Sequence, residues 1–189
     1  MPFNAPNLLT LLRILLIPLF VALFYLPTGW LTHHQVNLVA TAVFGLAALT
    51  DWFDGWLARS LNQTSAFGAF LDPVADKLMV ATALVVLVAI GRVHPVIAVI
   101  IIGREITISA LREWMAKIGD HKSVAVSFLG KIKTIAQMVS IVLLLYQDTI
   151  PPGIDAEVVG TWLIYLAAIL TLWSMVYCLR IALPKVWGR

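Results

Sequence analysis

Long apolar runs separated by short polar segments follow one another along the whole chain. Six of them are each close to the roughly 20 residues that a helix needs to cross a bilayer, and they lie at 8–26, 37–58, 70–90, 95–116, 127–147 and 159–181. A lipid-embedded backbone must satisfy its own hydrogen bonds, and runs of this length do so as helices. The strands of a membrane barrel would be shorter and would alternate in polarity. The pattern predicts an all-α, polytopic membrane protein with six transmembrane helices in one domain, 1–189.

The composition supports a membrane protein. Of the 189 residues, 61% are hydrophobic and 12% are charged. Soluble proteins carry roughly 25% charged residues, so the composition argues against a soluble domain. The formal net charge is +3, and we attribute it to membrane topology and to contact with anionic lipids rather than to binding of nucleic acid.

Basic residues are distributed unevenly between the predicted loops. The segments at one face of the membrane hold nine of them: Arg59, Lys77, Lys117, Lys122, Lys131, Lys133, Arg180, Lys185 and Arg189. The opposite loops hold only Arg92, the pair His33–His34 and the acidic stretch "QDTIPPGIDAE". Because basic loops remain in the cytoplasm, we expect both termini and the segment 50–77 to face the cytoplasm.

The segment "TDWFDGWLARSLNQTSAFGAFLDPVADK", residues 50–77, places four aspartates in this apolar chain. Asp51 and Asp54 are three residues apart, and Asp72 and Asp76 are four apart, so each pair shares one face of its helix. Two helices joined by a short loop can point all four carboxylates at one another. Such a cluster must protonate or bind cations, and an all-oxygen set suits Mg²⁺ or Mn²⁺. Two ions fit the charge, an arrangement suited to displacement at phosphorus.

Each part of this segment also has a simpler interpretation. Gly55, Ala58 and Gly68 either leave room for a ligand beside the backbone or allow close packing of helices. Arg59 either contacts phosphate or anchors its helix at the membrane interface. Asp72 precedes a proline, so it would also suit the N-cap of a helix that begins at that proline. Membrane carboxylates can also form a proton or ion path.

The complete set is Asp51-x2-Asp54-Gly55-x2-Ala58-Arg59-x8-Gly68-x3-Asp72-x3-Asp76, and it resembles the signature of the CDP-alcohol phosphotransferase family at every fixed position. Eight fixed residues at about 6% usage each give a chance match on the order of 10⁻¹⁰ per starting position. The resemblance implies a six-helix membrane protein, commonly a homodimer, whose active site lies at the cytoplasmic surface. An acceptor hydroxyl would attack the phosphate attached to the alcohol of a CDP-linked substrate, and CMP would leave.

The resemblance also implies roles for the signature residues. Its four aspartates would bind two divalent ions, Mg²⁺ or Mn²⁺, and the last of them, Asp76, would also act as general base on the acceptor hydroxyl. The cytidine side of the site would be formed by Gly55, Ala58 and Gly68, with Arg59 near it.

Segments outside the signature indicate the acceptor. The stretches "PNLLTLLRILLIPLF", "GREITISALREWM" and "VAVSFLGKIKTIAQM" are similar to bacterial members of the family that transfer from CDP-diacylglycerol to glycerol 3-phosphate, which implies a bacterial inner-membrane protein. Arg104 and Arg112 are eight residues apart, near one face of the fourth run, and Lys131 and Lys133 begin the fifth. A basic cluster inside a membrane bundle needs an anion, and the phosphate of glycerol 3-phosphate suits it.

Alternatives to these assignments stay open. The first arginine of the basic cluster would also suit a structural ion pair with Glu105 or Glu113, with the lysines acting as topology anchors. Asn7, Thr10 and Arg13, at the cytoplasmic end of the first run, are further candidates for contact with nucleotide or lipid phosphates.

Two other functions compete with this one. The first is the same chemistry with another acceptor, which would be serine, an inositol phosphate or phosphatidylglycerol. Serine carries no phosphate, so it would leave the basic cluster without its anion. A cation transporter that uses the aspartates as its ion site is the second. Transporters often contain repeated halves with broken helices, and this sequence contains no such repeat.

Overall fold

The computed structural model describes residues 5–27, 29–61, 66–117, 128–150 and 153–187. Within these ranges, the side chains of 5–7, 9, 51–61, 66–67, 69–70, 116, 128–131 and 181–187 lie outside the description. Six helices make up most of the described chain: α1 (Ala5–Leu23), α2 (His33–Leu61), α3 (Ala66–Ala89), α4 (Pro95–Lys117), α5 (Phe128–Tyr146) and α6 (Ala156–Trp187). A short antiparallel hairpin, β1 (Thr149–Ile150) with β2 (Ile154–Asp155), joins α5 to α6. The prediction of a helical fold is confirmed.

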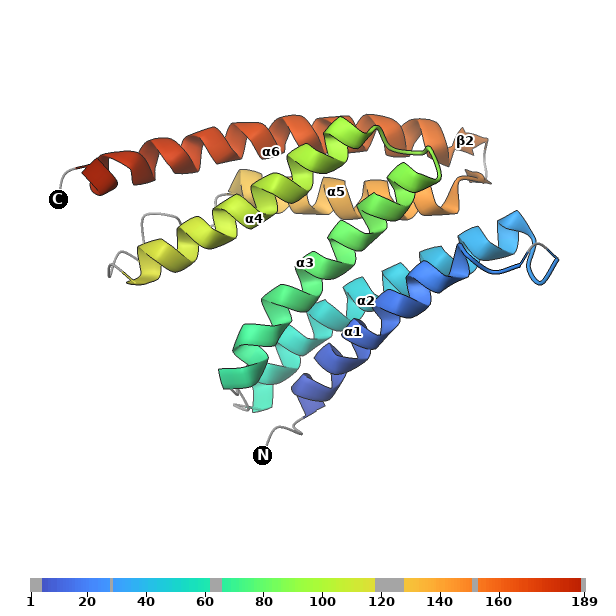
Figure 1. The fold of residues 1–189 in the computed structure, drawn as a ribbon, viewed down its shortest axis with the longest axis horizontal. Coiled ribbons are helices and arrows are strands. Elements are labelled where there is room, and N and C mark those ends of the chain that lie inside the picture. The colour runs from blue at the N-terminus through green and yellow to red at the C-terminus, as the bar shows by residue number, and fades with distance from the viewer. Residues whose placement is uncertain (1–4, 28, 62–65, 118–127, 151–152, 188–189) are drawn as a thin grey trace.

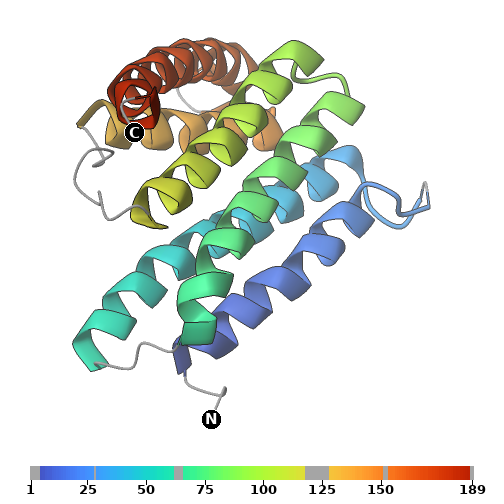
Figure 2. The same ribbon diagram turned by 60° about the vertical axis from the view of Figure 1, so that its left-hand side comes forward.

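Successive helices run in opposite directions along one bundle (Figure 1). The starts of α1, α3 and α5 and the last turns of α2, α4 and α6 lie at one end, here called the terminal end, and the hairpin lies at the other, the hairpin end. Helices α1, α2 and α3 pack on one another, α6 packs on α4 and α5, and the contacts of α2 with α5 and of α3 with α4 join the two groups (Figure 2). The two groups diverge toward the terminal end.

Side chains at the hairpin end set where two helices begin. The hydroxyl of Thr32 accepts a bond from the backbone N–H of Gln35, whose side chain accepts one from the backbone N–H of Thr32. This reciprocal pair is a capping box that starts α2 at the next residue. Asp155 caps α6 in the same sense, because one carboxylate oxygen accepts bonds from the N–H groups of Glu157 and Val158. These side chains satisfy backbone donors that have no partner within a helix.

The start of α3 differs from the expectation. The helix begins at Ala66 and contains Pro73 in its interior, so Asp72 is not an N-cap, and that alternative for it is wrong. A proline inside a helix lacks the N–H that would bond to the carbonyl four residues earlier, yet α3 continues through Pro73 and packs on α1 and α4. Asp72 therefore lies on the side of a helix, where it can face a neighbour.

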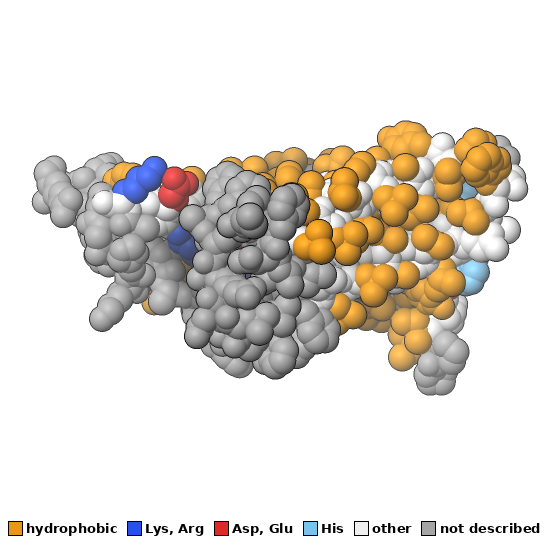
Figure 3. All heavy atoms as spheres, turned by 90° about the horizontal axis from the view of Figure 1, so that it is seen from below, with side chains coloured by type: hydrophobic (Ala, Val, Ile, Leu, Met, Phe, Trp, Pro, Cys, Tyr) orange, Lys and Arg blue, Asp and Glu red, His pale blue; other side chains and the backbone are white. Residues whose placement is uncertain are grey.

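Apolar side chains occupy both the interior and the outer faces of the bundle. Phe20, Phe44 and Leu84 are fully or almost fully buried between helices. On the outer face of α1, Leu15 and Leu19 are 68% and 52% exposed, and every other helix also exposes large apolar residues. Figure 3 shows one face of the molecule, on which hydrophobic side chains cover much of the described surface. An apolar exterior around an apolar core is the arrangement expected of helices that contact lipid on one side.

Helix length and composition indicate which helices could cross a membrane. Among the described residues, one segment, Ala156–Arg180 of α6, is long and apolar enough to cross a membrane, and Thr10–Leu23 and Ile132–Tyr146 are shorter apolar helices. Helix α4 carries Arg104 and Glu105 near its middle, and charges of this kind lower the mean hydropathy of such a helix. The helices coincide with the six predicted runs, while the six membrane crossings stay a prediction.

Candidate active site

The two aspartates of α3 share the face of the helix that packs on α1. The hydroxyl of Thr10, which is fully buried on α1, donates a hydrogen bond to the Oδ1 atom of Asp72. Asp76 follows one turn later on the same face, and both carboxylates are partly exposed. The prediction that Asp72 and Asp76 share one face of a helix is therefore confirmed.

A second residue of α1 lies beside these carboxylates. Arg13 is only 2% exposed, and with Asp76 it lines a small cavity of about 10 Å³ between α1, α2, α3 and α5. A space of this size holds about one water molecule. The structure therefore places Thr10 and Arg13 against the α3 carboxylates. Their contact with nucleotide or lipid phosphates stays a prediction, and the side chain of Asn7 lies outside the described residues.

The rest of the signature is described only in part. Five of its residues lie in the last three turns of α2, with side chains outside the description: Asp51, Asp54, Gly55, Ala58 and Arg59. Gly68, in the first turn of α3, is buried. The predicted cluster of four carboxylates is therefore untested, and within the described residues no three potential ligands of the Asp, Glu, His and Cys types come together around a metal position.

The described half of the carboxylate set fits a hard divalent cation. Asp72 and Asp76 supply oxygen donors from one helix face and keep partial access to solvent. Magnesium and manganese bind through one or two carboxylates together with water and substrate phosphates. A site built on this face therefore has the donor chemistry that the sequence predicts.

A second charged cluster joins α4, α5 and α6. The Oε1 atom of Glu105 accepts hydrogen bonds from Nη1 of Arg104 at 2.9 Å and from Nζ of Lys133 at 2.5 Å. The Nη2 atom of Arg104 donates to Oγ of Ser174 on α6 at 3.2 Å. Both cations are buried, with side chains 8% and 3% exposed, whereas that of Glu105 is 26% exposed. One carboxylate oxygen thus holds two buried cations together.

The structure brings Arg104 and Lys133 of the predicted basic cluster together at Glu105, and their contact with a phosphate stays a prediction. Arg112 is exposed on α4 and acts electrostatically on Lys133, as Arg104 does. The side chain of Lys131 lies outside the described residues. The alternative of a structural ion pair is also confirmed, because Arg104 does bond to Glu105.

Glu113, the other glutamate proposed as a partner for the arginine, pairs instead with Lys117 at 3.0 Å. Both members of that pair are 71% exposed. The charge of Glu113 is therefore held at the surface, away from the buried cations.

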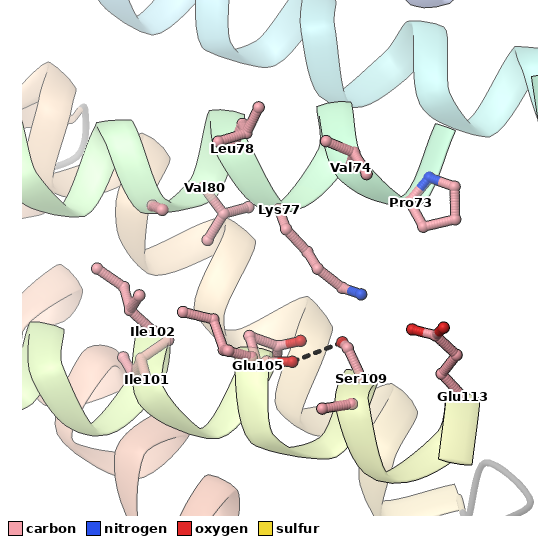
Figure 4. Close-up of a pocket in the computed structure, with 13 residues that line it drawn as sticks. Pro73, Val74, Lys77, Leu78, Val80, Ile101, Ile102, Glu105, Ser109 and Glu113 are labelled. Atoms are coloured by element: carbon pink, nitrogen blue, oxygen red, sulfur yellow. Dashed lines mark hydrogen bonds between the residues drawn. The ribbon is translucent and has the colours of Figure 1, made fainter. Parts of the chain in front are cut away.

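A cavity of about 660 Å³ lies between α3 and α4 and reaches the second charged cluster at Glu105. Figure 4 shows Lys77 extending from α3 toward Ser109 and Glu113 of α4, with Glu105 one turn further along. The hydroxyl of Ser109 donates to the backbone carbonyl of Glu105 at 2.6 Å. Pro73 lines the same cavity, next in the chain to Asp72. The segment 73–81 of α3 and the segment 101–113 of α4 therefore face each other across this cavity.

Sequence patterns had not indicated two members of the basic network. The sequence indicates Glu105 only as an alternative partner of Arg104. A glutamate directly after an arginine inside an apolar run is a usable signal, since an unpaired carboxylate in such a position is costly. Nothing in the sequence around Ser174 marks it as a partner of α4.

The chain belongs to the CDP-alcohol phosphatidyltransferase family, whose profile matches residues 3–173. Its curated relatives include the CDP-diacylglycerol–glycerol-3-phosphate 3-phosphatidyltransferases of Salmonella typhimurium and Escherichia coli K12, each 52% identical over 184 residues. The enzyme of the same name from Shigella flexneri is also 52% identical. In each case the alignment covers 96% of this chain and 96% of the relative. The family predicted from the signature is confirmed.

Proposed function

We propose that this protein is an enzyme that transfers the phosphatidyl group of CDP-diacylglycerol to glycerol 3-phosphate, giving phosphatidylglycerophosphate and CMP. The observation that carries the proposal is 52% identity to relatives named for this activity, over 96% of both chains. Two charged groups of the structure agree with this reaction: the α3 carboxylates beside α1, and the buried basic network around Glu105, which lines the α3–α4 cavity. The first suits a diphosphate with its counter-ions, and the second suits the phosphate of the acceptor.

The proposed reaction is a displacement at phosphorus. A hydroxyl oxygen of glycerol 3-phosphate forms a bond to the phosphorus that carries the diacylglycerol, and the bond from that phosphorus to the oxygen of CMP breaks. The electron pair of the broken bond leaves with CMP. Asp76 accepts the proton of the attacking hydroxyl as general base.

Residues of the chain position both substrates. Two divalent ions, Mg²⁺ or Mn²⁺, would neutralise charge on the diphosphate when bound. They would be held by the signature aspartates Asp51, Asp54, Asp72 and Asp76. Thr10 orients one of these carboxylates from α1. The cytidine side is assigned to Gly55, Ala58, Arg59 and Gly68. The acceptor phosphate is assigned to Arg104, Arg112, Lys131 and Lys133.

The same proposal places the enzyme in the bacterial inner membrane, as a multi-pass homodimer with the terminal end in the cytoplasm. The apolar exposed faces of the helices and the apolar segment of α6 support the membrane assignment. The nine basic residues of the terminal-end segments support the orientation. The homodimer is what the family resemblance implies.

The test is release of CMP by purified protein in detergent, with CDP-diacylglycerol and Mg²⁺ and one acceptor at a time. We expect turnover with glycerol 3-phosphate and none above background with serine, inositol phosphate or phosphatidylglycerol. Turnover with one of these acceptors instead would show that the protein is a transferase of the proposed kind with a different acceptor. Absence of CMP release with every acceptor would reject the enzyme and favour the transporter alternative.

A further inference from the structure

We propose that Glu105 is a positioning residue that holds Arg104 and Lys133 in place for the phosphate of the acceptor. This inference rests on the proposed function, because it assigns a role at the acceptor side of the same reaction. Its basis is one oxygen atom: Oε1 of Glu105 accepts from Nη1 of Arg104 at 2.9 Å and from Nζ of Lys133 at 2.5 Å.

The two cations would not stay together without the carboxylate. Their side chains are 8% and 3% exposed, so little solvent screens their mutual repulsion. Two like charges in a buried position either move apart or lose a proton. Glu105 opposes both outcomes, because its negative charge lies between them.

The bonds to Glu105 leave donors for a ligand. Lys133 has three N–H donors on its ammonium group, and a single carboxylate oxygen uses one of them. The Nε atom of Arg104 is buried and has no hydrogen-bond partner within the described part of the chain. A buried donor without a partner is costly, and an oxygen of a bound phosphate is a suitable acceptor for it.

The net charge of the cluster also suits a phosphate monoester. Arg104, Arg112 and Lys133 contribute +3 and Glu105 contributes −1, so the described groups sum to +2. A phosphate monoester carries about −1.5 to −2 at neutral pH. The cluster with its glutamate in place therefore nearly balances the charge of the acceptor.

This role and a purely electrostatic role predict opposite results for one substitution. Glu105→Gln raises the charge of the cluster by one unit. If the glutamate acted only through its charge, an anionic acceptor would then bind more tightly, and KM for glycerol 3-phosphate would fall. If the glutamate positions the two cations, the same change releases them and KM rises.

The experiment compares KM for each substrate in Glu105→Gln, Glu105→Asp and Glu113→Gln with wild type. Glu113 is the matched control, because it lies on the same helix and lines the same cavity but pairs with the exposed Lys117. We expect Glu105→Gln to raise KM for glycerol 3-phosphate by about tenfold or more, the scale of a lost charge-assisted contact. KM for CDP-diacylglycerol should change less than about twofold. Glu105→Asp keeps the charge with a shorter reach and should give an intermediate KM, and Glu113→Gln should resemble wild type.

The outcomes separate this inference from the proposed function. An unchanged or lower KM for glycerol 3-phosphate in Glu105→Gln would overturn the positioning role, and so would an equal rise for both substrates. If Glu105→Gln does not fold, as judged by thermal unfolding in detergent, Glu105→Asp decides, with a several-fold rise in the same KM expected and no rise counting against the role. A wild-type protein that releases no CMP with glycerol 3-phosphate would instead reject the proposed function itself.

Discussion

The hydroxyl of Thr10 donates a hydrogen bond to a carboxylate oxygen of Asp72, across the interface between α1 and α3. Thr10 is fully buried, so its hydroxyl faces the interior of the bundle and not solvent. A donor from a neighbouring helix fixes the rotamer of a carboxylate and so fixes the direction in which its second oxygen points. Thr10 of α1 thereby orients Asp72, a signature residue of α3.

Replacing Thr10 by valine tests this contact. The shapes are similar, but valine cannot donate, so Asp72 loses its orienting partner. We expect a ten- to hundredfold rise in the Mg²⁺ concentration needed for half-maximal activity, the usual scale for a lost partner of a metal ligand. Thr10→Ser keeps the hydroxyl and should recover most of the effect. A titration of activity against Mg²⁺ for both variants is the measurement, and an identical half-maximal concentration in Thr10→Val would contradict the role.

Asp76 and Asp54 should fail in different ways. Asp76→Asn keeps shape and one oxygen but removes the base, so we expect kcat to fall by about 10²–10⁴-fold. CDP-diacylglycerol binding should survive better in this variant than in Asp54→Asn, which removes a charge that we propose holds the ions. Turnover and lipid-nucleotide binding at saturating Mg²⁺, with folding checked in detergent, distinguish the two. Near wild-type turnover of Asp76→Asn would show that it is not the base.

Removal of divalent ions should abolish activity. Four clustered carboxylates need cations to stay ionised together, and the described pair has the oxygen donors for them. We expect excess chelator to stop CMP release and added Mg²⁺ or Mn²⁺ to restore it. Full turnover after extensive dialysis against chelator would rule out the two-ion assignment.

Helix positions were predictable from the sequence because each apolar run has a clear polar or proline boundary. The run 95–116 matches α4 (Pro95–Lys117), since proline at the first position favours a helix start. The predicted run 70–90 begins four residues after the start of α3 at Ala66, and α3 continues through Pro73, so the helix start that Asp72 and Pro73 would also suit is not used. The hairpin between α5 and α6 gave no signal, because its strands are two residues each.

Contacts within a helix were predictable, and contacts between helices were not. The spacing of Asp72 and Asp76 assigns them to one face of a helix without knowledge of the fold. The partner of Asp72 lies 62 residues away and that of Glu105 lies 28 residues away. Periodicity states which face of a helix is polar, but not which helix covers that face. The sequence therefore indicated the charged groups of the site and missed how they are held.

Gly160 of α6 packs closely against α5. A Cβ atom at this position would meet Cγ of Leu144 at 2.9 Å and Cβ of Leu143 at 3.2 Å, and the hydroxyl of Ser140 donates to the carbonyl of Gly160 at 2.7 Å. We expect Gly160→Ala to destabilise the fold by about 1–3 kcal/mol, the scale of overpacking. Gly45→Ala is the control, because a Cβ there meets nothing within 4 Å. Thermal unfolding of both variants in detergent tests the contact, and equal unfolding temperatures would show that the helices can separate without cost.

Arg92, in the loop between α3 and α4, joins three parts of the bundle at the hairpin end. Its Nη1 atom donates to the carbonyls of Leu144 and Leu145 at 3.1 and 3.0 Å, and its Nη2 atom donates to Oδ1 of Asn37 on α2 at 2.8 Å. The last carbonyls of a helix have no partner within it, so the guanidinium caps α5. Burial lowers the pKa of Arg92, and the attraction of a nearby glutamate opposes that shift. The group nevertheless stays charged at neutral pH, because arginine does not lose its proton in proteins.

We expect Arg92→Met to lower stability and to leave the chemistry intact. The change removes three hydrogen bonds from a charged donor, and we estimate the loss at about 2–4 kcal/mol from the scale of such bonds. In a chain of this size that corresponds to a fall of roughly 5–15 °C in the unfolding temperature. Arg92→Lys keeps the charge but lacks the planar fork, so it should recover less than half of the loss. Lys117→Met is the control, since it breaks a surface pair whose members are 71% exposed and such pairs contribute little.

The location of Arg92 makes its effect separable from catalysis. It lies in the loop that follows α3, at the hairpin end, whereas Asp76 lies near the middle of α3 (Ala66–Ala89). At a temperature well below unfolding, Arg92→Met should therefore retain wild-type KM for both substrates and a kcat within about twofold, a factor that corresponds to less than 0.5 kcal/mol in the barrier. Thermal unfolding and steady-state kinetics on one preparation provide both measurements. A large fall in kcat at low temperature, with the unfolding temperature unchanged, would contradict this prediction. It would show that the hydrogen bonds of Arg92 affect catalysis and not the stability of the bundle.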